Sequence, residues 1–226
     1  MHKKKTINLN HFANQIVLQM NISKTKIMDF INSSNTIHLN GHQIDKVENF
    51  TYIGSKLTLN GDVMVEITTR IALASSAFNR LINIWRSNTL STITKLRLFN
   101  SCVIPMLTYG CESWKSTSSS DKKLISFENK CLRRITNTHW SEFKSNERLR
   151  EETHQKYISD VIRKRRWFYI GHALRSDSKR IHQQSLSWTP SGKRARGRPR
   201  ETLKRTMFRE IKTMNIRSLQ ELQQLA

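Results

Sequence analysis

A sustained apolar seam between residues 65 and 85 constrains the fold of this chain more than any other feature. Apolar side chains recur there at alternating spacings of four and three residues, which is the period of one face of an α-helix. These side chains are Ile67, Ile71, Ala74, Phe78, Leu81 and Trp85. The seam therefore predicts a helix of roughly 20 residues that packs one face against the rest of the chain.

The same period predicts three further helices in the middle of the chain and a final amphipathic helix over Leu203–Leu225. Pro105 should kink or stop the first, because proline has no N–H donor for the helix. Asp121 follows a run of serines and can cap the second. The third should span residues 146–170 and end at Gly171. The expected buried positions are Leu96, Phe99, Cys102, Val103 and Met106 in the first, Leu124, Phe127, Cys131 and Ile135 in the second, and Leu149, Tyr157, Ile158, Val161, Ile162 and Phe168 in the third.

Two Asn-Gly dipeptides near the N-terminus predict short strands. Asn40-Gly41 separates two short segments, and this dipeptide tolerates the positive φ angles of both central positions in a type I′ turn. Asn60-Gly61 follows a second pair of short segments within residues 50–59. The expected fold class is therefore mainly α with a small β-hairpin region near the N-terminus (α+β), ending in a basic C-terminal segment.

The composition shows a large excess of positive charge. The 226 residues include 39 Lys and Arg against 17 Asp and Glu, which gives a net charge of +22 at pH 7. Residues 115–226 carry 27 of these cations and 11 of the acidic residues. Such an asymmetry predicts a polyanionic partner, and we expect RNA and DNA.

Neither a membrane nor a secretory destination is indicated. No window approaches 18 uninterrupted apolar residues, and the basic start MHKKKTINLNH is not followed by the apolar stretch of a signal peptide. Three cysteines are too few and too widely spaced for a disulfide framework. We expect an intracellular protein with no membrane partner, located in the nucleus or in a cytoplasmic ribonucleoprotein.

The cysteines and histidines of the chain make zinc the metal to consider. The candidate ligands are Cys111, Cys131, His139, His154 and His172. They lack the closely spaced Cys pair that structural zinc sites generally use, so we expect no metal and no cofactor. Cys102 and Cys131 are interpreted as core thiols. His172 is interpreted as a structural histidine in preference to a phosphate contact.

Residues 191–205, SGKRARGRPRETLKR, form a dense basic run. An extended Arg-Gly-Arg-Pro strip can enter a minor groove only about 6 Å wide, because glycine adds no bulk and proline keeps the chain extended. Arginines inserted there meet the negative potential of a narrow, AT-rich groove. The run resembles an AT-hook, and the alternatives are a nuclear localisation signal or a solvated basic loop. The residues expected to bind are Lys193, Arg194, Arg196, Gly197, Arg198, Pro199 and Arg200.

A series of motifs in fixed order runs through nearly the whole chain. In order, they are Asn21-x-x-Lys24-Thr25, Phe50-x-Tyr52-Ile53-Gly54-Ser55, Arg70-Ile71, Trp85, Lys95-Leu96-Arg97-Leu98, Pro105-x-x-x-Tyr109-Gly110-Cys111-Glu112-x-Trp114, Cys131-Leu132-Arg133-Arg134-Ile135, Trp140, Arg165-Arg166-Trp167-x-x-Ile170-Gly171-His172-x-x-Arg175 and Gly192-Lys193-Arg194-x-x-Gly197-Arg198-Pro199-Arg200. The series closely resembles the C-terminal part of the endonuclease/reverse transcriptase polyproteins of non-LTR retrotransposons.

The resemblance implies an organisation for the chain and roles for some residues. Lys24 matches the lysine of the family's motif D, which is implied to assist the leaving pyrophosphate. The residues that match the family's primer-grip segment are Phe50, Tyr52, Gly54 and Ser55. The expected parts are 1–63 as the end of a palm, 64–135 as a helical thumb, 136–175 as a basic helical region, 176–202 as a basic linker with the AT-hook-like core, and 203–226 as a C-terminal helix.

The chemistry of that family needs carboxylates that this chain lacks. Two-metal catalysis places the metals about 3.5–4 Å apart, and the family holds them with palm carboxylates that include an adjacent Asp pair. The chain has six aspartates, and no two of them are adjacent. Lys24 is therefore an orphan of motif D. We expect no catalytic residue and no enzyme in this chain, and magnesium would be needed only by an intact polymerase.

The sequence therefore predicts a nucleic-acid-binding fragment of a retrotransposon reverse transcriptase that does not polymerise alone. The thumb would grip a template–primer duplex through phosphates, and its last helix carries cations away from its apolar stripe. These cations are Lys122, Lys123, Lys130, Arg133 and Arg134. The basic region after the thumb should add Arg163, Lys164, Arg165 and Arg166. The alternatives are a domesticated AT-hook-like DNA-binding or regulatory protein, and a decayed copy without a selected role.

Overall fold

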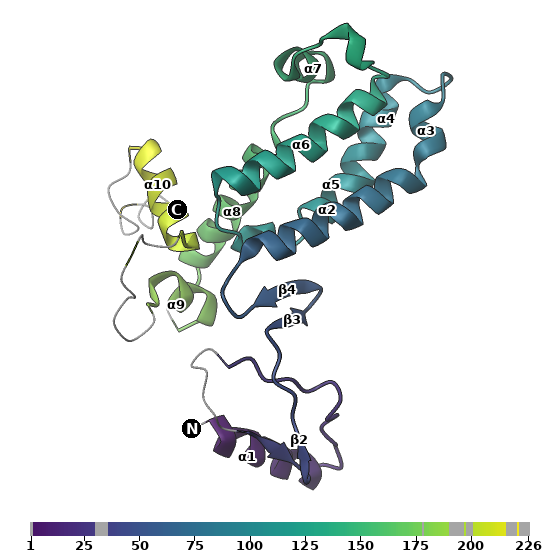
Figure 1. Cartoon of the computed structure of the whole chain (residues 1–226). Coiled ribbons are helices and arrows are strands. Elements are labelled where there is room, and N and C mark those ends of the chain that lie inside the picture. Colours follow the sequence, from purple (N-terminus) through teal and green to yellow (C-terminus); the bar gives the residue numbers. More distant parts are fainter. Residues whose placement is uncertain are drawn as a thin grey trace. The chain divides into compact units, whose positions relative to one another are not determined.

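Helices make up most of the described chain, and two short β-hairpins lie near its N-terminus (Figure 1). The expected fold class is therefore confirmed. The computed structural model describes residues 2–29, 36–177, 179–189, 197, 201–215 and 221. The chain divides into two units, Met1–Glu66 and Ile67–Ala226, and the division falls in the first turn of helix α2 (Val63–Arg80). None of the helices in the described ranges is long and apolar enough to span a membrane.

The N-terminal unit contains one helix and two hairpins. Its elements are α1 (His2–Gln15), β1 (His38–Leu39), β2 (His42–Gln43), β3 (Asn49–Tyr52) and β4 (Ser55–Thr58). Asn40 and Gly41 join β1 to β2 with φ angles of 52° and 80°, so the predicted type I′ turn is confirmed. Leu39 and Ile44 are buried beside this hairpin.

The second hairpin has a turn that the sequence did not indicate. Ile53 and Gly54 join β3 to β4 with φ angles of 47° and 76°. A β-branched residue in the left-handed region is an outlier, because its branched side chain crowds the backbone there. The second Asn-Gly dipeptide follows β4 and leads into α2, where the Asp62 carboxylate accepts a hydrogen bond from the N–H of Met64 (2.9 Å).

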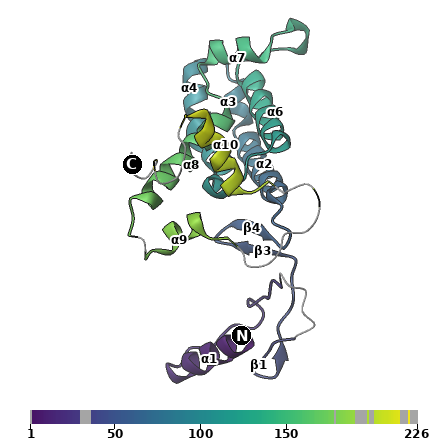
Figure 2. The same cartoon turned by 90° about the vertical axis from the view of Figure 1, so that its left-hand side faces the viewer.

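The C-terminal unit is built from helices and short helical turns (Figure 2). Besides the rest of α2, its elements are α3 (Ile82–Arg86), α4 (Thr92–Leu98), the π-helical turn η1 (Phe99–Val103), α5 (Ile104–Leu107), the 3₁₀ turn η2 (Cys111–Ser113), α6 (Ser118–Ile135), the 3₁₀ turn η3 (Trp140–Glu142), α7 (Asn146–Thr153), α8 (Ile158–Leu174), α9 (Ile181–Ser187) and α10 (Leu203–Thr213). Helix α8 packs against α6 and against η2.

The apolar seam forms two helices where one was predicted. Phe78 and Trp85 are buried as expected, but α2 ends at Arg80 and α3 begins at Ile82. The rings of Phe78 and Trp85 stack at 4.8 Å between centroids. The indole Nε1 of Trp85 also donates to the carbonyl oxygen of Phe78 (2.7 Å), so the break supplies an acceptor for a buried indole N–H.

Pro105 distorts its helix without ending it. Just before the proline, the chain widens into the π-helical turn η1, in which the N–H of Ile104 donates to the carbonyl of Phe99, five residues earlier. The wider turn changes the phase of the helix, because each turn contains more residues. Phe99 and Val103 are buried as expected. The expected burial of Cys102 and Met106 is wrong, because both side chains are exposed.

Helix α6 begins earlier than predicted. Its N-cap is Thr117, whose hydroxyl accepts from the N–H of Ser120 (3.1 Å), while the Ser120 hydroxyl accepts from the N–H of Thr117 (3.0 Å). This reciprocal pair is a capping box. Asp121 is therefore not the cap; it lies in the first turn and accepts hydrogen bonds from the hydroxyl of Ser116.

The predicted helix over residues 146–170 is two helices, α7 and α8. His154 ends α7 with φ 51°, a left-handed conformation that stops the helix. Gly171 does not end α8, which continues to Leu174. The inward placement of Phe168 is wrong as well, since its side chain is 77% exposed. The predicted linker after residue 175 contains helix α9.

The three cysteines differ in burial, which leads to a prediction. Cys111 and Cys131 are buried, whereas Cys102 is exposed, so the interpretation of Cys102 as a core thiol is wrong. Burial raises the pKa of the Cys111 and Cys131 thiols to about 12. Because the thiolate is the reactive form, a thiol reagent near pH 8 should label Cys102 alone in the native protein and all three residues in denaturant. Intact-mass measurement counts the adducts, and native labelling of Cys102→Ser would contradict the prediction.

Candidate nucleic-acid interface

Five cations of helix α6 lie on one side of that helix. At about 100° per residue, they fall within an arc of about 120° that lies opposite the buried Leu124, Cys131 and Ile135. The five are Lys122, Lys123, Lys130, Arg133 and Arg134. All except Arg133 are exposed, and Arg133 is half-buried. We call these five residues the α6 cationic face.

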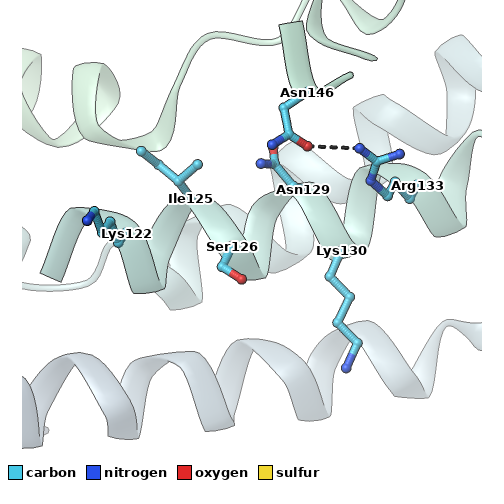
Figure 3. Close-up of a pocket in the computed structure, with 7 residues that line it drawn as sticks. All are labelled: Lys122, Ile125, Ser126, Asn129, Lys130, Arg133 and Asn146. Carbon is cyan, nitrogen blue, oxygen red and sulfur yellow. Dashed lines mark hydrogen bonds between the residues drawn. The ribbon is translucent and has the colours of Figure 1, made fainter. Parts of the chain in front are cut away.

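One pocket of about 490 Å³ opens on the α7 side of this face (Figure 3). At one end of it, the Arg133 guanidinium is fixed by donating to Asn146 Oδ1 (2.9 Å) and to the carbonyl of Lys144 (2.8 Å). Lys130 points away from Asn146 (Figure 3). The described residues that line the pocket include no acidic side chain; they are Lys122, Ile125, Ser126, Asn129, Lys130, Arg133 and Asn146.

A second pocket of about 620 Å³ lies between α2 and α6. Lys130 lines it too, so this side chain borders both pockets. The other cations that line it are Lys123 and Arg134, and the polar side chains from α2 are Thr68, Ser75 and Asn79. In the part of the chain that the structure describes, no acidic side chain lines this pocket either. The two hollows beside α6 therefore share a positive character.

The exposed cations of α6 are not neutralised by neighbouring acids. Within the described ranges, Lys122, Lys123, Lys130 and Arg134 form no ion pair. Asp121 and Glu128 are the acidic residues of α6; Glu128 is buried and pairs with Arg150, and Asp121 accepts hydrogen bonds from Ser116. The positive charge of this face is thus available to an external anion.

A buried polar cluster behind α6 holds the helix in place. Arg150 donates from Nη2 to Glu128 Oε2 (2.7 Å) and to Asn129 Oδ1 (2.8 Å). Its guanidinium also lies 3.9 Å from the centre of the Tyr157 ring. The Glu128 carboxylate further accepts from the N–H of Ile158 (3.2 Å) at the start of α8. Burial raises the pKa of Glu128, while the Arg150 hydrogen bond and charge act in the opposite direction. The cluster thereby fixes α6 against α7 and α8.

The four predicted cations of α8 do not form one exposed group. Arg163 pairs with Asp160 (2.9 Å), and Arg165 pairs with Glu112 (3.0 Å). Lys164 is exposed and has no acidic partner among the described residues. The prediction that Arg166 binds nucleic acid is wrong. Its side chain is 1% exposed and pairs with Glu210, so it cannot reach a phosphate in this conformation.

Arg166 has a structural role, because its ion pair with Glu210 ties α10 to α8. The Glu210 carboxylate also accepts a hydrogen bond from the indole Nε1 of Trp167 (2.7 Å). Met207 packs from α10 into a small apolar cluster with Ile170 of α8. The partner of Arg166 lies 44 residues away along the chain, so no local sequence pattern could have shown it.

The residues to which the resemblance gave roles lie in the N-terminal unit. Lys24 is exposed, and its N–H donates to Asn21 Oδ1 (3.0 Å) in a turn. The primer-grip-like residues share the β3–β4 hairpin, where Phe50 pairs with Leu57 and Tyr52 pairs with Ser55. The hairpin therefore brings these residues together. Their contact with a primer stays a prediction.

Most of the AT-hook-like run lies outside the described residues. These are Lys193, Arg194, Arg196, Arg198, Pro199 and Arg200. Gly197 is described, and its φ of 117° belongs to the region that favours glycine. The hook stays a prediction.

One feature of α8 was not predicted from the sequence. Phe168 and Tyr169 are exposed, and they lie beside Lys164 and His172 in a pocket of about 460 Å³. The spacing of Lys164, Phe168 and His172, four residues apart, was a signal that could have revealed a common face.

Comparison with known proteins points to mobile genetic elements. A family model described as a domain of unknown function (DUF6451) matches residues 77–109. An uncharacterised transposon-derived protein of Caenorhabditis elegans is 26% identical over 194 residues, which cover 79% of this chain and 67% of that protein. No solved structure matches the chain. By sequence, the chain is therefore similar to a transposon-derived protein over most of its length.

Proposed function

We propose that this chain is transposon-derived and binds nucleic acid through phosphates, as the thumb-containing C-terminal part of a non-LTR reverse transcriptase would. The α6 cationic face carries this proposal. The similarity to a transposon-derived protein supports the origin. The resemblance of the ordered motifs supports the assignment of α2–α6 to a thumb-like region.

The dimensions of the α6 cationic face suit a nucleic-acid backbone. Lys122 and Arg134 are 12 residues apart, which corresponds to about 18 Å along a helix. A DNA duplex carries one negative charge per about 1.7 Å of its axis, so several phosphates fall within that distance. Uncompensated lysines and arginines attract such a backbone in a way that does not depend on sequence.

Polymerisation is not part of the proposed function. The six aspartates of the chain include no adjacent pair, and a two-metal site needs closely placed carboxylates. The α6 cationic face consists of lysines and arginines, which bind phosphate and repel divalent metal ions. We therefore propose a binding role without nucleotidyl transfer by this chain alone.

Neutralising the exposed part of the α6 cationic face should weaken binding strongly. Lys122→Gln, Lys123→Gln, Lys130→Gln and Arg134→Gln together should lower the affinity for a short DNA duplex on the order of 10³-fold at about 0.1 M salt, if each cation contacts one phosphate. Glutamine keeps a high helix propensity, so the helix should remain. Fluorescence anisotropy with a labelled duplex measures the change.

A matched control removes the same charge elsewhere. Arg86→Gln, Arg97→Gln, Lys156→Gln and Lys212→Gln also lower the net charge by four, and all four side chains are exposed and lie outside α6. This control should lose much less affinity than the α6 variant. Equal losses in the two variants would show that net charge alone attracts the duplex, and the assignment of the interface to α6 would then be wrong.

A further inference from the structure

The outer side of helix α8 carries an aromatic and cationic stripe. Lys164, Phe168 and His172 follow one another at intervals of four residues, which places them on one face of the helix, and Tyr169 at the edge of this stripe lines the same pocket. The opposite side of the helix is buried and includes Ile162, Arg166, Ile170, Ala173 and Leu174. The stripe is therefore not the face with which α8 packs into the unit.

The aromatic side chains of this stripe are unusually open. Phe168 is 77% exposed and Tyr169 is 42% exposed. Both line a pocket of about 460 Å³. Exposed apolar surface that is gathered at one place and bordered by polar groups marks a binding site more often than scattered exposed residues do.

The charges around the pocket favour an anionic ligand. Among the described residues, the lining contains one acidic side chain, that of Glu112, whose carboxylate accepts a hydrogen bond from Arg165 Nε (3.0 Å). Arg165 also donates from Nη1 to the hydroxyl of Thr108 (2.6 Å), which fixes its position. Because Arg165 compensates Glu112, the ammonium group of Lys164 gives the lining a net positive charge.

We propose that this stripe binds an unpaired stretch of RNA or DNA, with bases stacked on Phe168 and Tyr169 and a phosphate held by Lys164. Aromatic side chains stack on the π-face of every base, and neighbouring cations bind the backbone. A partner protein could also contact the aromatic surface, but the positive charge of Lys164, which no described acidic residue compensates, favours a ligand that carries phosphates. The proposal rests on the proposed function, because it adds a single-strand site to a duplex-binding chain.

The experiment compares one variant on two ligands. Phe168→Ala should lower the affinity for a single-stranded oligothymidine by at least about 5-fold, because base–aromatic stacking contributes this much or more. The affinity for a duplex should change by less than about 2-fold, because paired bases are not free to stack there. Phe168→Leu should lose as much as Phe168→Ala, since leucine keeps the apolar character and removes the π-face. The control is Phe143→Ala, whose ring is 86% exposed and lies outside this pocket.

The outcomes separate this proposal from the proposed function. An unchanged single-strand affinity in Phe168→Ala, with native duplex binding intact, overturns the stacking site alone. Full binding by Phe168→Leu also overturns it, because that result indicates a purely apolar contact such as a protein segment. If the native chain binds neither ligand, the proposed function fails and the stacking site fails with it. Circular dichroism of each variant checks that the fold is kept.

Discussion

Replacing Arg150 by methionine should lower the free energy of unfolding by about 3–5 kcal/mol, because it leaves a buried carboxylate without its cation. In the native chain, Arg150 binds Glu128 and Asn129 and lies over the ring of Tyr157. Glu128 is 2% exposed. Of the contacts described above, only the hydrogen bond from the N–H of Ile158 would still stabilise the Glu128 charge after Arg150 is replaced.

The effect of Arg150→Met should depend on pH. Burial raises the pKa of Glu128 above its ordinary value of 4.5, and loss of Arg150 should raise that pKa further. A carboxyl group whose pKa is higher in the folded state favours folding below the unfolded pKa, and this contribution is lost as the pH rises through the folded pKa. The loss of stability should therefore be smaller at about pH 4 than at about pH 7.

Urea unfolding followed by circular dichroism at both pH values measures this effect. Glu128→Leu combined with Arg150→Met removes both charges, so it should recover part of the stability that Arg150→Met loses. Equal losses at the two pH values, together with no recovery in the double variant, would mean that the pair is not a buried charge pair.

Replacing Glu210 by alanine should free helix α10 from α8. The change leaves the buried guanidinium of Arg166 and the indole N–H of Trp167 without the acceptor that both use. An uncompensated buried charge costs about 3–5 kcal/mol. The backbone amides of Leu203–Thr213 should consequently exchange with deuterium faster, because α10 can open without unfolding the rest of the unit.

Hydrogen–deuterium exchange with peptide-level mass spectrometry measures this opening. Glu210→Gln keeps an acceptor oxygen and should cause a smaller change. Glu147→Ala removes an exposed carboxylate on α7 and should shift stability by less than about 0.5 kcal/mol. If α10 exchanges equally fast in Glu210→Ala and Glu147→Ala, the Arg166–Glu210 pair does not hold the helix.

The parts of the fold that follow from local chemistry could be predicted from the sequence. The period of the seam located Phe78 and Trp85 in the core, because burial of one helix face sets that period. Asn40-Gly41 identified its turn, since few other dipeptides accept positive φ at both positions. Pro105 marked the position of the helix distortion, although the form of the distortion, a π-helical turn, was not indicated.

Other features depend on contacts that a local pattern does not contain. The π-helical turn shifts the phase of its helix, so Cys102 became exposed where a uniform period placed it in the core. His154 adopts a left-handed conformation without being a glycine, so the end of α7 had no clear signal. Phe168 faces outward because α8 buries its other side against α6 and η2.

In the candidate site, too, some features follow from the local sequence pattern and others depend on tertiary contacts. The cations of α6 share one face because of the helical period alone, so their common direction was predictable. Whether these cations form ion pairs was not predictable in the same way. It depends on the tertiary contacts of the nearby acidic residues, such as the pairing of Glu128 with Arg150. Arg166 belonged to a run of four cations in the sequence, yet its pairing with Glu210 buries it.

The salt dependence of duplex binding tests the central claim most directly. For the native chain, log K should fall linearly with log salt between about 50 and 200 mM, with a slope of about −0.9 for each phosphate contacted. The variant with glutamine at Lys122, Lys123, Lys130 and Arg134 should show a slope shallower by up to about 3.6, or 0.9 for each lost contact. Native binding that does not change with salt, or identical slopes for the native chain and this variant, would contradict phosphate binding by α6.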